Sequence, residues 1–97
     1  MKGYWIIFVG DVTDEDAQKQ YGALWKPIAK KYQATVKALD TASTLKESNG
    51  TSRVVVVEFP SLEAAKACYE GSAYQDAKQF AVRASQRELV IIEGDIA

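Results

Sequence analysis

The chain has 97 residues, a length that suits one domain and is too short for two. Its residues are 47% hydrophobic and 26% charged, which is typical of a globular domain and unlike a disordered chain. Lysines and arginines are scattered along the sequence and the net charge is −1, so nothing electrostatic favours binding to nucleic acid or to an anionic membrane. We therefore expect a single domain over residues 1–97 that has neither of these partners.

The absence of histidine excludes several kinds of site. No Ser-His-Asp or Cys-His catalytic arrangement can form, and neither can a histidine-ligated metal or haem site. The single cysteine, Cys68, cannot form an internal disulfide, which fits a reducing compartment. We expect no metal and no cofactor, although a site for a hard cation made of carboxylates alone stays open.

The first predicted element is a strand over Tyr4–Val9, where every residue is aromatic or β-branched. This apolar run is too short for a signal peptide and far too short to span a bilayer. Together with the lone cysteine, it predicts a cytoplasmic location.

A helix is predicted next, because Thr13 followed by Asp16 three residues later is typical of a capping box. Pro27 lies within the helical stretch, lacks an N–H and crowds the preceding turn, so we expect a kink or a break there. The apolar residues that share one helical face are Ala17, Tyr21, Leu24, Trp25, Ile28, Ala29 and Tyr32.

The second half begins with a weaker predicted strand over 34–39 and a polar segment over 40–52, whose Asn49-Gly50 pair indicates a turn. The clearest strand of the chain follows over Arg53–Phe59.

Two helical segments and a final strand complete the prediction. Ser61 is expected to cap a helix over 62–70 that ends at Gly71 as a C′ glycine. Ser72 and Gln75 suggest a second capping box, after which helical spacing continues as far as Ala84. The last predicted strand covers 89–93.

This order predicts an α+β fold, a ferredoxin-like βαββαβ sandwich with a four-stranded antiparallel sheet and helices on one face. Three strands are nonetheless apolar on both faces: in the third, Val54 and Val56 point one way while Val55 and Val57 point the other. An uncovered second face would expose several hundred Å², about the largest patch usual for a monomer. We therefore expect a homodimer that pairs through this sheet face, the alternative being a monomer with an unusually apolar sheet.

Several short motifs support a family resemblance over Lys2–Gly94. They resemble the bacterial family called domain of unknown function 1330, which implies a dimeric α/β barrel in which two ferredoxin-like domains pack sheet to sheet, and which implies no reaction. The motifs are Gly3-Tyr4-Trp5, Val12-Thr13-Asp14, Glu58-Phe59-Pro60-Ser61, Ala67-Cys68-Tyr69, Tyr74-Gln75 and Leu89-Val90-Ile91-Ile92-Glu93-Gly94.

The chain departs from the family pattern at three arginine positions. Members commonly carry Gly-Gly-Arg where this chain has Gln33-Ala34-Thr35, and Arg-Gly-Gly where it has Leu39-Asp40-Thr41. A third arginine is usual near Ala81, but here the nearest is Arg83. If those arginines bind an anionic ligand in relatives, this chain has lost or moved that site.

The candidate ligand-binding residues are Tyr21, Trp25, Glu58 and Tyr69. Aromatic side chains with polar tips suit a pocket between helices and sheet, although the same residues also suit plain core packing. Glu58 is a candidate acid or base if it is buried, and otherwise an ion-pair partner at a strand end. Alternation places it with Val54 and Val56, so we expect it near the rim of the dimer interface. Cys68 lies among alanines and is expected to be a packed apolar side chain.

These features favour a small dimeric domain that binds a small apolar or aromatic molecule between its helices and its sheet. The alternative is a non-catalytic homodimeric module for structure or assembly. The residues identify no catalytic group, and whether the protein is an enzyme stays open at this point.

Overall fold

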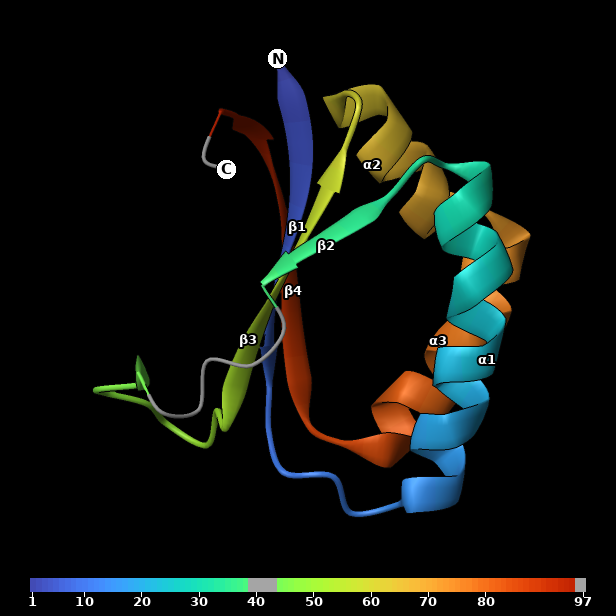
Figure 1. Ribbon diagram of the computed structural model, residues 1–97. Coiled ribbons are helices and arrows are strands. Elements are labelled where there is room, and N and C mark those ends of the chain that lie inside the picture. Colours follow the sequence, from blue (N-terminus) through green and yellow to red (C-terminus); the bar gives the residue numbers. More distant parts are fainter. Residues whose placement is uncertain (39–43, 96–97) are drawn as a thin grey trace.

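The computed structural model describes residues 1–38 and 44–95 (Figure 1). Four strands and three helices are present in this part of the chain. In chain order they are β1 (Lys2–Val9), α1 (Glu15–Lys31), β2 (Thr35–Ala38), β3 (Arg53–Phe59), α2 (Leu62–Glu70), α3 (Ser72–Ala84) and β4 (Arg87–Gly94).

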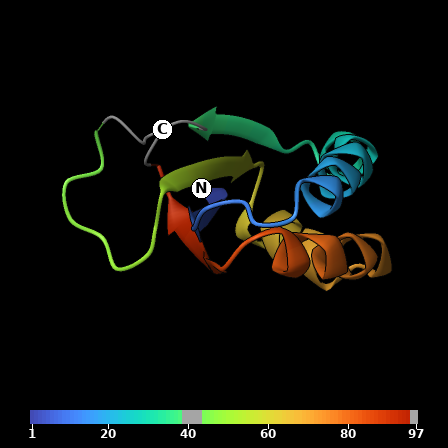
Figure 2. The same ribbon diagram turned by 90° about the horizontal axis from the view of Figure 1, so that it is seen from below.

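The strands form one sheet in the order β2-β3-β1-β4, and each neighbouring pair is antiparallel. This order brings the first and third strands to the centre, as in the ferredoxin-like fold, so the predicted fold class is confirmed. All three helices lie on the same side of the sheet, with α1 alongside α3 (Figures 1 and 2).

The start of α1 differs from the prediction. Asp14, and not Thr13, is the N-cap: its carboxylate Oδ1 accepts a hydrogen bond of 3.0 Å from the Ala17 N–H. The Thr13 N–H and hydroxyl instead both donate to the Ala84 carbonyl, at 2.8 and 3.4 Å. The predicted capping box is therefore wrong, because Thr13 is used to fasten the start of α1 to the end of α3.

Of the kink or break expected at Pro27, the break is absent, since α1 continues through this residue to Lys31, and the kink stays a prediction. A proline removes one hydrogen bond of the helix, which lowers its stability but does not by itself decide where it ends. Here α1 packs extensively along α3, and these tertiary contacts support the helix.

Ser61 caps α2 as predicted: its hydroxyl oxygen accepts a hydrogen bond of 3.1 Å from the Ala64 N–H. Gly71 follows α2, but its φ of −65° is open to any residue, so it is not the left-handed C′ glycine expected. A Cβ at this position would lie 3.0 Å from the Tyr32 hydroxyl, which explains the glycine by space and not by conformation.

The second predicted capping box is wrong as well. α3 begins at Ser72 without a side-chain cap. Gln75 instead donates from Nε2 to the Tyr69 carbonyl at 2.6 Å, which ties α3 to the end of α2.

The weak second strand is confirmed over Thr35–Ala38, and Leu39, with which the prediction ended, lies outside the described residues. The predicted turn contains Gly50 in the left-handed region, at a φ of +91°. Residues 40–43 of the polar segment are likewise outside the described part.

The two sheet faces differ in cover. On the face toward the helices, here called the helix face, Trp5 and Phe59 are fully buried and Val57 is 2% exposed. On the opposite face, here called the open face, Phe8 and Val90 are 38% and 46% exposed. The apolar open face that the sequence predicted is therefore present. The positions of the open face on the three longer strands, apolar and charged together, are Lys2, Tyr4, Ile6, Phe8, Val54, Val56, Glu58, Glu88, Val90, Ile92 and Gly94.

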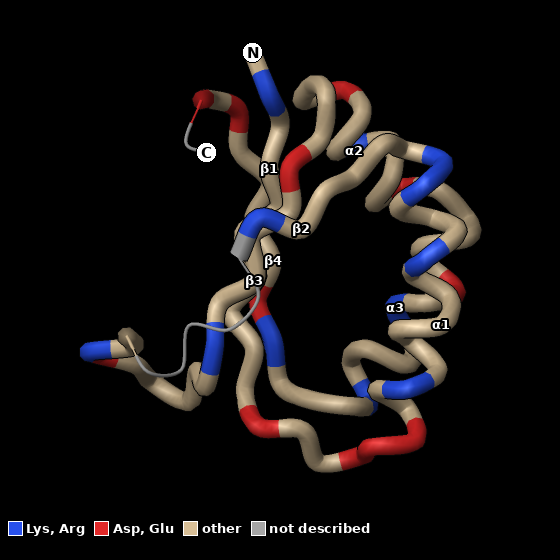
Figure 3. Tube along the Cα trace, viewed as in Figure 1, with Lys and Arg blue, Asp and Glu red and all other residues tan. Residues whose placement is uncertain are grey.

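Charged positions are distributed over helices, strands and loops, with acidic residues at the entrance to α1 (Figure 3). Among the residues described, no three acidic, histidine or cysteine side chains lie close enough together to hold a metal ion. In 1–38 and 44–95, no helix combines the length and the apolar character needed to cross a bilayer.

Candidate functional site

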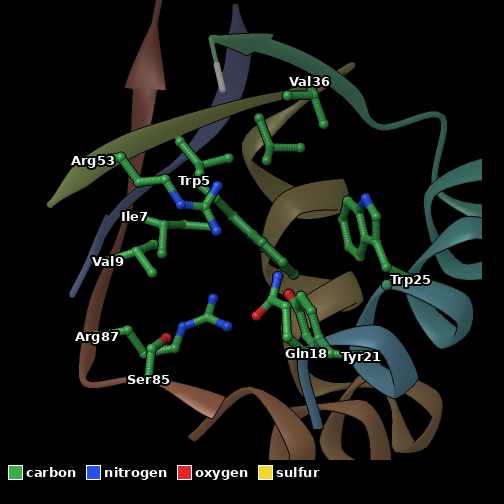
Figure 4. A pocket seen from close by; sticks show the side chains of 13 residues that line it. Trp5, Ile7, Val9, Gln18, Tyr21, Trp25, Val36, Arg53, Ser85 and Arg87 are labelled. Carbon is green, nitrogen blue, oxygen red and sulfur yellow. The ribbon is translucent and has the colours of Figure 1, made fainter. Parts of the chain in front are cut away.

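A cavity of about 250 Å³ lies between α1 and the helix face of the sheet (Figure 4). Trp5, Ile7 and Val55 contribute to its floor, and Tyr21 and Trp25 of α1 lie opposite them. Most of the lining is apolar, as is usual for sites that bind small molecules.

The cavity exists because the helices approach the sheet to different extents. α2 carries small residues toward the sheet, Ala65 and Cys68, both fully buried, and packs directly on β1, β3 and β4. α1 packs mainly on α3, and its side chains nearest the sheet are the large rings of Tyr21 and Trp25. Rings of this size keep the α1 backbone at a distance and leave space beside them.

Trp5 forms the wall between this cavity and the packed core. Its ring centroid lies 4.8 Å from that of Tyr74, 5.0 Å from that of Phe59 and 5.5 Å from that of Trp25. Its indole Nε1 donates to the Ala65 carbonyl at 3.0 Å, so its polar atom is paired and its ring orientation is fixed.

The end of the cavity away from Trp25 is cationic. Arg53 on β3 and Arg87 on β4 both pair in register with Val9 of β1, so they flank it on the helix face. Their side chains extend from the sheet toward Gln18 and Tyr21 of α1 (Figure 4). None of the lining residues is acidic.

The two arginines are held differently. Arg87 donates from Nη2 to the Tyr74 hydroxyl at 3.4 Å, and its guanidinium carbon lies 5.2 Å from the centre of the Tyr21 ring. Within 1–38 and 44–95, the Arg53 guanidinium has no hydrogen bond or ion pair. Arg53 is thus a cation directed into an apolar cavity without a partner in the described protein.

A pair of phenols joins the arginines to the aromatic wall. The hydroxyls of Tyr21 and Tyr74 lie 3.1 Å apart, and only Tyr21 lines the cavity. Burial, together with the neighbouring Tyr21 phenol, raises the pKa of the Tyr74 phenol, so Tyr74 stays protonated.

The four predicted ligand-binding residues do not converge. Tyr21 and Trp25 line the cavity. Tyr69 lies behind the wall, with its ring 5.9 Å from Trp5, and does not line the cavity. Glu58 lies on the open face, where its Oε2 accepts a hydrogen bond of 3.1 Å from the Tyr4 hydroxyl. Tyr4 therefore shares that face with Glu58.

The cationic residues of the cavity were missed as ligand contacts from the sequence. Arg53 has the same strand parity as Val55 and Val57, which alternation had placed together on one face. Arg87 has the parity of Leu89 and Ile91 in the same way. Applying the alternation to Arg53, the first residue of its predicted strand, and starting the last predicted strand at Arg87 would have placed both arginines toward the helices.

Cys68 is a packed core residue, as expected. Its side chain is fully buried, and burial raises the pKa of the thiol from 9.0 to about 12, so the reactive thiolate is disfavoured.

Comparison with known proteins agrees with this architecture. Residues 2–95 match the family described as Domain of unknown function (DUF1330). The chain belongs to this family. No curated protein matches the chain.

Similar solved structures extend the likeness in fold. A protein of unknown function from Rhodopseudomonas palustris is 14% identical, with 99% of this chain and 84% of that chain covered and a TM-score of 0.73. A dimeric ferredoxin-like protein of unknown function from Jannaschia sp. CCS1 is 13% identical, with 97% and 100% covered and a TM-score of 0.71. A mutant of SnoaB, a cofactor-independent oxygenase from Streptomyces nogalater, is 10% identical, with 99% and 95% covered and a TM-score of 0.59.

Proposed function

We propose that this DUF1330 domain is a cytoplasmic homodimer that binds a small apolar or aromatic molecule between α1 and the sheet. The observation that carries the proposal is the cavity of about 250 Å³, whose lining is largely apolar and includes Trp5, Tyr21 and Trp25. An apolar cavity of about 150 Å³ is enough for benzene, so this one has room for one or two fused rings. A module that served only for assembly would have no need of such a space.

Binding is favoured over catalysis by the composition of the lining. It contains no carboxylate, lysine, cysteine or histidine, so it holds none of the usual general bases that would activate the Ser85 hydroxyl as a nucleophile. SnoaB is an oxygenase on a similar fold, but at 10% identity its activity does not transfer to this chain.

The homodimer is supported by the open face, where Phe8 and Val90 are exposed beside Val56. A similar structure, from Jannaschia, is described as dimeric. Val56→Asp would bury a charge in the sheet-to-sheet interface and should release monomer. Light scattering at micromolar concentration checks this, and a wild-type monomer mass would contradict the dimer.

Ligand binding is tested by filling the cavity from α1. Gly22 lines the cavity, and a Cβ added there would meet no heavy atom within 4 Å. Gly22→Leu should therefore place a side chain in the space and abolish binding of a neutral aromatic probe such as 2-naphthamide. Its matched control is Ala23→Leu, the same change at the exposed next residue.

Isothermal titration calorimetry measures binding to both variants and to the wild type. The expected result is binding by the wild type and by Ala23→Leu but not by Gly22→Leu. If Gly22→Leu binds the probe as well as Ala23→Leu does, the cavity is not the binding site.

A further inference from the structure

We propose that the ligand is an organic anion, an aromatic carboxylate of one or two rings, with its carboxylate between Arg53 and Arg87 and its ring against Trp5 and Trp25. This inference rests on the proposed function and specifies the chemical class of the ligand. It is carried by the juxtaposition of two guanidinium groups at one end of an otherwise apolar cavity.

The first step is the charge balance of the cavity. Arg53 and Arg87 flank Val9 on the two strands that border β1, about two strand spacings or 10 Å apart at the backbone. Like charges that share a cavity of low polarity repel, and no acidic residue lines the cavity to offset them. An anion bound between them removes this repulsion and supplies the partner that Arg53 does not have within the described residues.

The second step is the direction of the hydrogen bonds at the cationic end. A guanidinium only donates, so the Tyr74 oxygen is the acceptor of its bond with Arg87. Tyr74 is 1% exposed, so the hydrogen of its hydroxyl needs an acceptor within the protein, which the Tyr21 oxygen provides at 3.1 Å. The Tyr21 hydrogen is then free to be donated into the cavity.

The cationic end therefore presents donors: the Arg53 guanidinium, the remaining N–H groups of Arg87 and the Tyr21 hydroxyl. Such a set suits a ligand group that only accepts hydrogen bonds and carries negative charge. A carboxylate fits because its two oxygens match the planar fork of an arginine. A neutral alcohol or amide would leave the two charges uncompensated.

The third step is the size and polarity of the rest of the space. The other end is formed by Trp5, Trp25, Val36 and Val57, with no charged group among them. Drug-sized ligands occupy pockets of about 300–1,000 Å³, so a cavity of about 250 Å³ suits a smaller molecule. A flat ring against the two indoles and a carboxylate at the arginines uses both ends at once.

The experiment compares two probes of the same shape, 2-naphthoate and 2-naphthamide, by isothermal titration calorimetry. The wild type should bind the anion roughly tenfold or more tighter than the amide, since hydrogen bonds to charged groups are the stronger ones. Added salt should weaken binding of naphthoate and leave binding of naphthamide unchanged.

Arg53→Gln is the decisive variant, because within 1–38 and 44–95 the Arg53 side chain has no polar partner that the change would break. This variant should have an affinity for naphthoate that is roughly tenfold or more weaker than that of the wild type, and its affinity for naphthamide should differ by less than about threefold. Arg53→Lys, which keeps the charge but not the planar fork, should fall between the wild type and Arg53→Gln. The matched control is Arg83→Gln on the exposed end of α3, which should change neither affinity.

Each outcome decides between the two proposals. Equal affinity of the wild type for both probes, or equal weakening of both by Arg53→Gln, would overturn the anionic ligand while leaving the aromatic binding site in place. Failure of the wild type to bind either probe would overturn the site as well.

Discussion

The two ends of the helix layer are built from different residues, and the difference determines where the protein has space. Under α2, small side chains such as Ala65 and Cys68 let the helix approach the strands, and the region is fully packed. Under α1, Tyr21 and Trp25 face the sheet, and a cavity remains beside them. Large side chains can thus create space, by holding a helix away from a sheet, where small ones would close it.

The largest expected change in the free energy of unfolding comes from a comparison of the two tryptophans whose rings meet at the boundary between these regions. Trp5 is fully buried, so Trp5→Ala should lower the free energy of unfolding by about 3–5 kcal/mol. Trp25 is only partly buried, and Trp25→Ala should cost less than half as much. Urea unfolding of both variants checks this, and similar losses would mean that the α1 side is packed as tightly as the α2 side.

The close approach of α2 is tested next by Gly3→Ala. A Cβ at Gly3 would lie 2.3 Å from the Ser61 carbonyl oxygen and 2.8 Å from the Leu62 Cα, both of which are backbone atoms. The entry of α2 would have to shift, at an expected cost of about 2 kcal/mol or more in the free energy of unfolding. A loss below about 0.5 kcal/mol would show that this contact between β1 and the start of α2 is not tight.

These contrasts also separate what the sequence predicts from what it does not. Alternation along Arg53–Phe59 predicts both sheet faces correctly, because strand periodicity is a local property. The Thr13 cap was wrong because Thr13 bonds to Ala84, a partner distant in the sequence about which local spacing carries no information. The Ser72 cap was wrong because Gln75 donates to the Tyr69 carbonyl at the end of α2 and not to the start of its own helix.

The cavity was foreseen only in part, for a similar reason. Tyr21 and Trp25 were expected in a cleft from helical spacing alone. Glu58 was grouped with them for its chemistry although its parity placed it on the open face, and Arg53 and Arg87 were not considered as ligand contacts. The cavity itself depends on the distance between α1 and the sheet, and this distance cannot be inferred from a pattern of residues in the sequence.

The packed region under α2 should also affect how the free energy of unfolding depends on pH. Burial raises the pKa of the Cys68 thiol from 9.0 to about 12, so the native state keeps a proton that the unfolded chain releases above pH 9. The free energy of unfolding of the wild type, relative to that of Cys68→Ala, is therefore highest below pH 9 and declines as the pH rises toward 12. Between pH 8 and pH 10 the relative loss should be about 1 kcal/mol, measured by urea unfolding of both proteins. A difference that is constant with pH would mean that the thiol is accessible to water.

The smallest change in the free energy of unfolding is expected beside the cavity under α1, and it is a gain and not a loss. Gly22 is inside α1, where a Cβ would meet nothing within 4 Å, so Gly22→Ala should raise the free energy of unfolding by about 0.5–1 kcal/mol. Thermal and urea unfolding measure the gain. A loss of stability would show that the space beside Gly22 is already filled in the native protein.

The sheet also separates the cavity from the proposed interface, since the lining strand residues lie on the helix face and the dimer would form through the open face. In the proposed dimer, the two cavities open on opposite outer sides, with both sheets between them. Occupation of one site then changes nothing that the other site contacts, and coupling between them requires such a change. The dimer should therefore take up two ligands independently, with a hyperbolic isotherm and a Hill coefficient of about 1.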